Sequence, residues 1–253
     1  FLTLLIAACG EKPRTALDNP RELVVLTRPG VVTYAIDGSR GTSGFDSDLV
    51  RMLATGLGLK LRIVVAANDE DIQKRLKNNE AHLAAAWQVP LEDAQIRAGN
   101  AYFESSNTVV THEALLPIGD IAQLANKTVY VVAGSRQEKT IRNAAQGPTP
   151  IPGLNVIAMS KRTELDLMEG VAKQYFESAL VDSAVFDIGN NYYPDLQQSL
   201  QIGEKKPIVW LFAPGVTPEL ITKANDFLAK IEKNGEMARL RDRYFGHVAR
   251  LTQ

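Results

Sequence analysis

Residues 44–49 of this 253-residue chain read Gly-Phe-Asp-Ser-Asp-Leu, and residues 58–61 read Gly-Leu-Lys-Leu. Between these stretches, apolar side chains recur at helical spacing from residue 49 to residue 57, which predicts an amphipathic helix over 46–57 that stops at the glycine. Alternating apolar residues over 61–65 then predict a strand. The stretch therefore indicates a helix followed by a half-buried strand.

The same alternation continues in both directions along the chain. Further strand-like runs lie at 23–26, 83–87, 128–132, 154–159, 179–181 and 207–212. Further helical patterns begin near residues 69, 135, 165, 217 and 237. This order favours an α/β fold with mostly parallel sheets flanked by helices. In such sheets, ligands bind beyond the carboxyl ends of the strands.

Composition and motifs exclude several classes of function. The net charge is −1, with no basic stripe that could neutralise the phosphates of a nucleic acid, so we expect no nucleic-acid partner. The sequence has no P-loop, no Gly-x-Ser-x-Gly elbow and no His-Glu-x-x-His motif. We therefore expect no catalytic residue, metal or cofactor in this chain, although the protein it comes from could still be an enzyme.

The start of the chain resembles the end of a bacterial lipoprotein signal. Residues 1–8 are mostly apolar and end in two alanines before Cys9, the only cysteine, and residues 10–21 are polar with two prolines. This pattern predicts a signal-peptide remnant, a lipidated Cys9 and a linker over 1–21. The resemblance implies a periplasmic protein anchored by lipid, with Gly10 favouring the outer membrane. The alternative is a buried apolar segment with a free thiol.

Several pieces of the sequence, taken in order, resemble family 3 of the periplasmic solute-binding proteins. They are residues 44–49 with 58–61, then 83–86, 132–135, 180–183 and 243–246. The resemblance implies a two-lobed periplasmic-binding-protein-like fold of type II, with two crossover strands and a ligand in the cleft between the lobes. The first lobe would comprise 22–112 plus 206–247, and the second lobe 113–205.

A closer resemblance is to the N-terminal regulatory domain of the membrane-bound lytic transglycosylases of type F, carried by residues 126–135, 180–183 and 243–248. It implies a sensory domain for an amino-acid-like ligand, with 248–253 opening a linker to a peptidoglycan-cleaving domain. Peptidoglycan would then be a partner only through that further domain. The alternatives are a free-standing solute-binding lipoprotein of an amino-acid importer and an enzyme built on this scaffold.

Lytic transglycosylases use a glutamate in a Glu-Ser motif as their acid and base. The dipeptide occurs at Glu104-Ser105 and Glu177-Ser178. Both lie inside the pattern of the binding domain, so we interpret them as surface residues.

The resemblance also implies a set of ligand-binding residues. Asp182 matches the aspartate that binds the ammonium group of an amino acid, although it could simply cap the following helix. Ser135, with Gly134 before it, matches the site where a helix N-terminus binds the carboxylate. Tyr34 falls where an aromatic ring stacks on the ligand, or it could be a core aromatic.

The first-lobe wall departs from the pattern of the family. Ala86 and Val89 fall among its ligand-binding positions, but Val89 replaces the usual threonine, and Glu92 or Asp93 stands near the place of the usual arginine. Arg97 could substitute for that arginine, although its spacing predicts that it lies on the following helix. These departures mean that the sequence alone does not identify the ligand or show whether the cleft still binds one.

Overall fold

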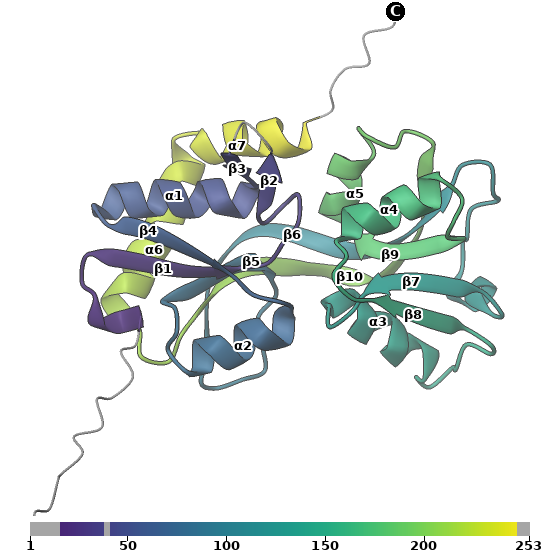
Figure 1. The fold of residues 1–253 in the computed structure, drawn as a ribbon, viewed down its shortest axis with the longest axis horizontal. Helices are drawn as coiled ribbons and strands as arrows, with labels where there is room; N and C mark the ends of the chain where they lie inside the picture. The colour runs from purple at the N-terminus through teal and green to yellow at the C-terminus, as the bar shows by residue number, and fades with distance from the viewer. Residues whose placement is uncertain (1–15, 38–40, 247–253) are drawn as a thin grey trace, which may run out of the picture.

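The computed structural model describes residues 16–37 and 41–246, which form two lobes joined by two long strands (Figure 1). The largest sheet has the order β4-β1-β5-β10-β6-β9-β7-β8 and runs through both lobes. The α/β fold with two lobes is confirmed. Cys9 and His247 lie outside the described residues.

The first lobe has parallel strands at its centre. β1 (Glu22–Thr27) pairs with β4 (Lys60–Val65) on one side and β5 (Leu83–Gln88) on the other. The other elements of this lobe are η1 (Ala16–Asp18), β2 (Ala35–Asp37), β3 (Gly41–Ser43), α1 (Phe45–Leu57), α2 (Asp69–Lys77), α6 (Pro218–Lys233) and α7 (Glu236–Phe245). All six residues of β5 are buried, because the sheet is covered on both faces.

The second lobe repeats this plan. β7 (Thr128–Val132) runs parallel to β8 (Asn155–Met159) and to β9 (Ser178–Asp182). Its other elements are η3 (Ile121–Leu124), α3 (Arg136–Ala145), α4 (Glu164–Ala172) and α5 (Ser183–Gly189). α7 of the first lobe also packs against α5, so the last described helix touches both lobes (Figure 1).

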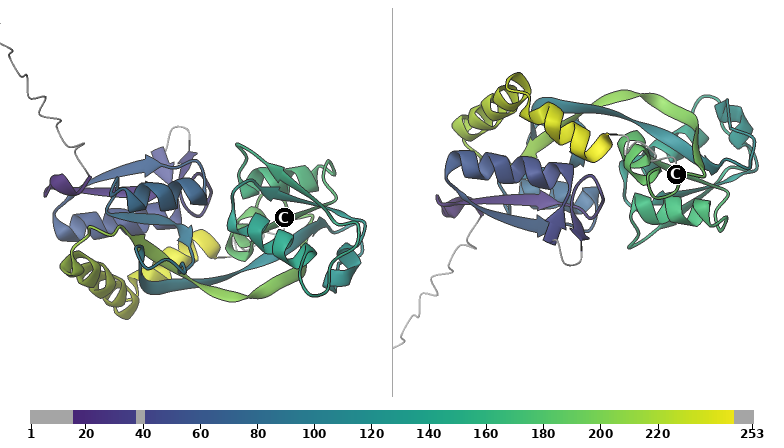
Figure 2. Two further views of the ribbon diagram at one scale, coloured as in Figure 1. Left: turned by 90° about the horizontal axis from the view of Figure 1, so that it is seen from below. Right: turned by 90° about the horizontal axis from the view of Figure 1, so that it is seen from above.

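Two strands cross between the lobes. β6 (Arg97–His112) and β10 (Leu196–Phe212) pair with each other antiparallel and run along one side of both lobes (Figure 2). β5 pairs with the end of β10 in the first lobe, whereas residues 107–111 of β6 pair with β9 in the second. β6 and β10 therefore connect the sheet of the first lobe to the sheet of the second.

Arg97 does not lie on a helix, so that expectation is wrong. It opens β6, and its guanidinium donates to the carbonyl groups of Ala213 (3.4 Å), Pro214 (3.3 Å) and Val216. These carbonyls satisfy the guanidinium at the end of β10, so Arg97 does not substitute for the missing cleft arginine.

Candidate functional site

The carboxyl ends of six parallel strands face one another across the lobe boundary. In the first lobe, β1 leads into Arg28, β4 leads to Asp69 and β5 ends at Gln88. In the second lobe, β7, β8 and β9 lead respectively into 133–136, 160–164 and 182–183. Because strand ends are where α/β sheets bind ligands, this boundary is the candidate site.

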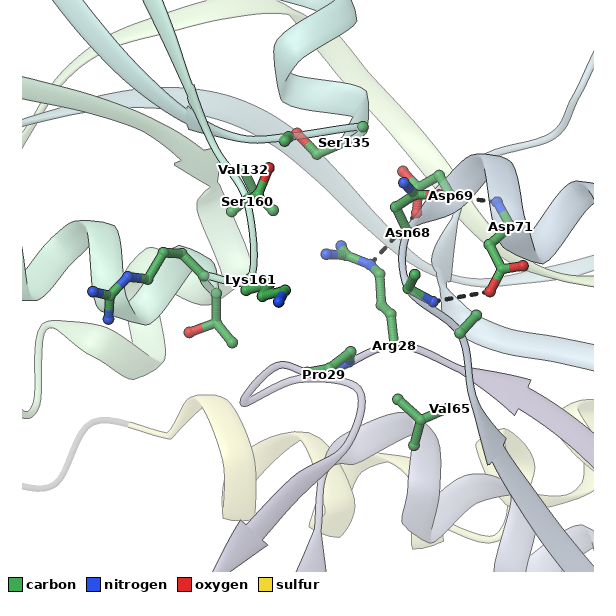
Figure 3. A pocket seen from close by; sticks show the side chains of 16 residues that line it. Arg28, Pro29, Val65, Asn68, Asp69, Asp71, Val132, Ser135, Ser160 and Lys161 are labelled. Carbon is green, nitrogen blue, oxygen red and sulfur yellow. Dashed lines mark hydrogen bonds and ion pairs between the residues drawn. The ribbon is translucent and has the colours of Figure 1, made fainter.

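A cavity of about 690 Å³ lies at this boundary and is lined from both lobes. The first lobe contributes the loop after β1 and the end of β4 with the start of α2, and the second lobe contributes the turns after β7 and β8. Figure 3 shows the Arg28 side chain pointing into the space between Asp69 on one side and Lys161 on the other, with Ser135 beyond it. The volume lies within the usual range for small-molecule sites, about 300–1,000 Å³.

Arg28 is the central cation of the cleft. Its Nε donates to the carbonyl oxygen of Ala86 (3.2 Å) and lies 3.7 Å from Asp69 Oδ1, and its Nη2 lies 3.5 Å from Glu164 Oε1. Burial by itself would lower the pKa of the Arg28 guanidinium, but Asp69, Glu164 and Asp182 together raise it above its usual value. Arg28 therefore stays charged and connects the two lobes.

Glu164 opens α4, where Thr163 caps the helix, and it is buried. Its Oε2 accepts the backbone N–H of Asp182 at 2.6 Å. Burial raises the pKa of the Glu164 carboxyl, with a smaller contribution from the charge of Asp182, while Arg28 opposes the shift. The carboxyl thus joins the ends of β8 and β9 to the cation of the first lobe.

Asp182 is fully buried and has three donors. Ser105 Oγ and the backbone N–H of Ala184 (2.9 Å) donate to Oδ1, and the guanidinium of Arg136 donates to Oδ2. The bond to Ala184 caps α5, so the interpretation of Asp182 as a helix cap describes one of its contacts. Of its other two donors, Ser105 is neutral and Arg136 is a cation of the chain itself.

Direct contacts between the lobes hold the cleft closed in this structure. Asp69 Oδ2 accepts the backbone N–H of Arg136 at 3.2 Å, and Lys139 Nζ lies 3.9 Å from Glu70 Oε1. Gly134 approaches Asn68 so closely that a Cβ built on it would lie 2.8 Å from Asn68 Nδ2. Together with the pair of Arg28 and Glu164, these contacts join α2 and β1 to α3 and α4.

Asp46 of the Gly-Phe-Asp motif supports the first-lobe wall from behind. It is fully buried, and its carboxyl accepts the backbone N–H of Trp87 (2.8 Å) and the hydroxyl of Tyr102 (2.5 Å). Burial raises the pKa of Asp46 to about 7, against the lowering effect of these two donors. Trp87 has φ 57°, a left-handed conformation that is uncommon for a residue with a side chain. The motif therefore fixes the backbone that leads into Gln88 and Val89.

The residues predicted from the sequence are brought together only in part. Gly134 and Ser135 line the main cavity, and Ser135 Oγ accepts the N–H of Glu138 as the cap of α3. Val89 lines a neighbouring cavity of about 160 Å³. Tyr34 is half-buried in the loop before β2 and is not among the residues that line either cavity.

The two Glu-Ser dipeptides differ from the surface interpretation in one respect. Both glutamates are exposed, and Glu177 pairs with Lys127 at 2.5 Å, but Ser105 and Ser178 are buried. Ser105 belongs to the cleft through Asp182, whereas Ser178 Oγ donates to the carbonyl of Thr128.

Sequence reasoning missed four charged residues of the cleft, namely Arg28, Asp69, Arg136 and Glu164. Their positions in the sequence could have indicated them as site residues. Arg28 directly follows a buried strand, and each of the other three is the first residue of a helix that follows a strand and a turn. Within residues 16–37 and 41–246, no group of three or more His, Cys, Asp or Glu side chains is arranged to hold a metal ion. None of the helices in the same residues is long and apolar enough to cross a membrane.

Comparisons with known proteins agree with the fold. The family model described as bacterial extracellular solute-binding proteins, family 3, matches residues 23–247. The structure superposes on ArgBP from T. maritima, in a mutant form, with a TM-score of 0.76 at 19% identity, covering 90% of this chain and 96% of that one. It also superposes on the substrate-binding protein AbpA of an amino acid ABC transporter from Streptococcus pneumoniae, bound to L-arginine, with a TM-score of 0.77 at 18% identity, covering 89% and 94%.

Curated relatives carry the name membrane-bound lytic murein transglycosylase F. The protein from Pseudomonas syringae pathovar syringae is 33% identical over 98% of this chain and 50% of its own length. The protein from Pseudomonas putida is 34% identical over 98% of this chain and 51% of its own length. The chain therefore spans about half the length of these relatives.

Proposed function

Because this chain belongs to family 3 of the bacterial extracellular solute-binding proteins, we propose that it binds a small, amino-acid-like molecule between its two lobes. The observation that carries the proposal is the cavity of about 690 Å³, which is lined by residues of both lobes. A ligand that touches both lobes stabilises the closed arrangement, because it gains contacts there that an open cleft does not offer.

The proposed contacts come in part from residues that line the cavity and in part from the positions that the family resemblance implies. Gly134 and Ser135, at the N-terminus of α3, offer a favourable place for a negative group of the ligand. We propose Ala86, Val89 and Tyr34 as residues of the first-lobe wall. We propose Asp182 as the carboxylate that balances the positive charge in the cleft.

Binding is tested by a thermal-shift screen of free amino acids, N-acyl amino acids and dipeptides. At a ligand concentration 100 times its Kd, the folded state gains about 2.7 kcal/mol, which corresponds to a rise in Tm of roughly 5–10 °C for a chain of this size. Ser160→Trp places an indole at the cavity and is expected to weaken binding at least about tenfold. Asn155→Trp, on the exposed start of β8 at the other end of the strand, is the control. No Tm shift with any compound would contradict the proposal.

We propose further that the binding domain regulates a lytic transglycosylase of which this chain is one half. Support comes from relatives named as such enzymes, of which the chain covers about half. The alternative is a free-standing solute-binding lipoprotein of an importer. Sequencing the gene beyond the codon for Gln253 separates them, because a lysozyme-like domain in the same reading frame supports the first and an immediate stop codon supports the second.

We also propose that Cys9 carries a lipid that anchors the protein on the periplasmic side of the outer membrane. The proposal is supported by the Ile-Ala-Ala-Cys sequence at 6–9 after an apolar run. Radioactive palmitate is expected to label the wild-type protein when it is expressed with its own signal sequence, and Cys9→Ser is expected to lose the label. Equal labelling of the two proteins would contradict a lipid at this residue.

A further inference from the structure

We propose that Arg136 acts as a built-in counter-ion for Asp182 and thereby makes the cleft select anionic ligands without a free ammonium group over zwitterionic amino acids. N-acylated amino acids are the simplest ligands of this class. The inference rests on the proposed binding function of the cleft and specifies the charge of the ligand.

Asp182 has no free position for a ligand cation. Its two carboxylate oxygens accept from Ser105, Ala184 and Arg136, the whole residue is inaccessible to solvent, and it is not among the residues that line the main cavity. A ligand ammonium could reach it only by displacing the guanidinium of Arg136, whose side chain is 16% exposed. Displacement would leave a largely buried cation without its partner, which is unfavourable.

The other acids of the cleft are occupied as well. Asp69 accepts from Gln88 Nε2 (2.9 Å) and from the backbone N–H of Arg136 (3.2 Å), besides facing Arg28. Glu164 accepts the N–H of Asp182 and faces Arg28. Asp71, at the edge of the cavity, accepts the N–H of Ala67 at 3.0 Å. Each carboxylate that could attract an ammonium group is already bound by the chain.

Positive groups at the same cavity are not occupied in this way. Lys161 and Arg162, in the turn after β8, line the cavity, and within the described part of the chain their side chains have no hydrogen-bond or ion-pair partner. Both are exposed, and Lys161 has φ 57°, a left-handed conformation. Figure 3 shows Lys161 on the side of the cavity opposite Asp69.

The unpaired charge that faces a ligand is therefore positive. Ser135 adds a hydroxyl hydrogen, since its Oγ already accepts the N–H of Glu138 and its own O–H is free to donate. A carboxylate placed near Ser135 and Lys161 would find hydrogen-bond donors, whereas an ammonium at the same position would find no carboxylate that the chain leaves free. The cavity also has room for an acyl group in addition to the amino acid, since drug-sized ligands occupy pockets of similar volume.

The experiment compares matched ligands on one protein. Calorimetry measures the Kd of L-alanine, L-leucine, L-glutamate and L-phenylalanine and of their N-acetyl forms. For the wild type we expect at least one N-acetyl compound to bind with a Kd at least about tenfold lower than that of its free parent. Arg136→Ala frees Asp182 and is expected to reverse this preference.

Arg142→Ala is the matched control, because Arg142 lies on the same helix, is exposed and pairs with Glu138 at 2.8 Å. It is expected to keep the wild-type preference. If Arg136→Ala does not fold, Arg136→Lys keeps the positive charge and is expected to retain the preference for N-acetyl compounds.

The possible outcomes are distinct. Free amino acids that bind the wild type as tightly as their N-acetyl forms would overturn the inference and leave the proposed binding function intact. A wild-type preference for N-acetyl forms that survives unchanged in Arg136→Ala would overturn the role of Arg136. If neither the free nor the N-acetyl amino acids bind, and the thermal-shift screen is also negative, the proposed binding function itself is overturned.

Discussion

Asp182→Ala is expected to lower the free energy of unfolding by about 3–5 kcal/mol, the usual cost of removing one partner of a buried ion pair. The substitution leaves the guanidinium of Arg136 without its carboxylate, in a place where its side chain is only 16% exposed. It also removes the cap of α5, because Asp182 Oδ1 accepts the N–H of Ala184 at 2.9 Å. Urea unfolding followed by circular dichroism measures the effect.

Two further variants separate the causes of this loss. Asp195→Ala removes an exposed carboxylate of the same lobe and is expected to change the free energy of unfolding by less than about 0.5 kcal/mol. The double variant Asp182→Ala with Arg136→Leu removes both charges, and it is expected to be less destabilised than the sum of the single variants. If Asp182→Ala unfolds at the same urea concentration as the wild type, the pair does not stabilise the fold.

This expected effect on stability also bears on how binding data are interpreted. A loss of ligand binding in Asp182→Ala could result from a damaged second lobe, because the residue supports α3 through Arg136 and α5 through its cap. Arg136→Ala is the more direct probe of the site, since it leaves the cap of α5 in place.

Local patterns were sufficient to predict the parallel strands and most of the helices. The C-terminus of α1 at Gly58 and the N-terminus of α6 near Thr217 were predicted from the sequence. Both are marked by cap residues, which act within one turn of the chain. Glycine at 58 adopts φ 66°, the left-handed conformation that ends many helices. Such features need no knowledge of distant contacts, so a single sequence contains them.

The crossover strands were harder to predict, because distant pairing determines them. The pattern of 207–212 predicted a short strand, yet β10 begins at Leu196, and its middle part is polar and exposed. β6 likewise begins at Arg97, in a stretch whose spacing suggested a helix. These residues are extended because β6 and β10 pair with each other along most of their length, and no local hydrophobic period marks such pairing.

Sequence motifs marked some residues of the lobe boundary, but they gave no sign of the contacts that join the two lobes. Ser135 and Asp182 stand at strand ends within recognisable motifs, and the structure has them at the lobe boundary. The sequence indicated only that a helix begins near Asp69, whereas in the structure its carboxylate oxygens accept from Gln88 Nε2 and from the N–H of Arg136. The partner of Asp69 lies 67 positions away in the sequence and in the other lobe, so nothing near Asp69 indicates the contact.

The two family motifs that are farthest apart in the sequence meet in the structure. Tyr244 donates its hydroxyl hydrogen to Asp48 Oδ2 (2.8 Å), and its oxygen accepts the N–H of Gly44 (3.1 Å). Arg243 Nη1 lies 3.2 Å from the same Asp48 oxygen. The start of α1 and the end of α7 are thus joined, so the Gly-Phe-Asp-Ser-Asp motif also determines where the last described helix lies.

Gly44→Ala is expected to disrupt this junction and to lower the free energy of unfolding by about 2–5 kcal/mol, from backbone strain and overpacking together. Gly44 has φ 140° and ψ 139°, a combination that residues with a side chain rarely adopt. A Cβ at this position would lie 2.3 Å from the carbonyl oxygen of Thr33. That oxygen cannot easily retreat, because it accepts the hydroxyl of Ser47 at 2.6 Å.

Gly56→Ala is the matched control for this substitution. Gly56 lies within α1, and a Cβ built on it meets no atom within 4 Å. In a helix, alanine is more favourable than glycine by roughly 0.5–1 kcal/mol, so Gly56→Ala is expected to raise stability slightly. Urea unfolding of the two variants therefore compares the same chemical change at a crowded and at an open position. Equal midpoints for both variants would contradict the close approach of Gly44 to Thr33, and with it the structural reason for the glycine that opens the motif.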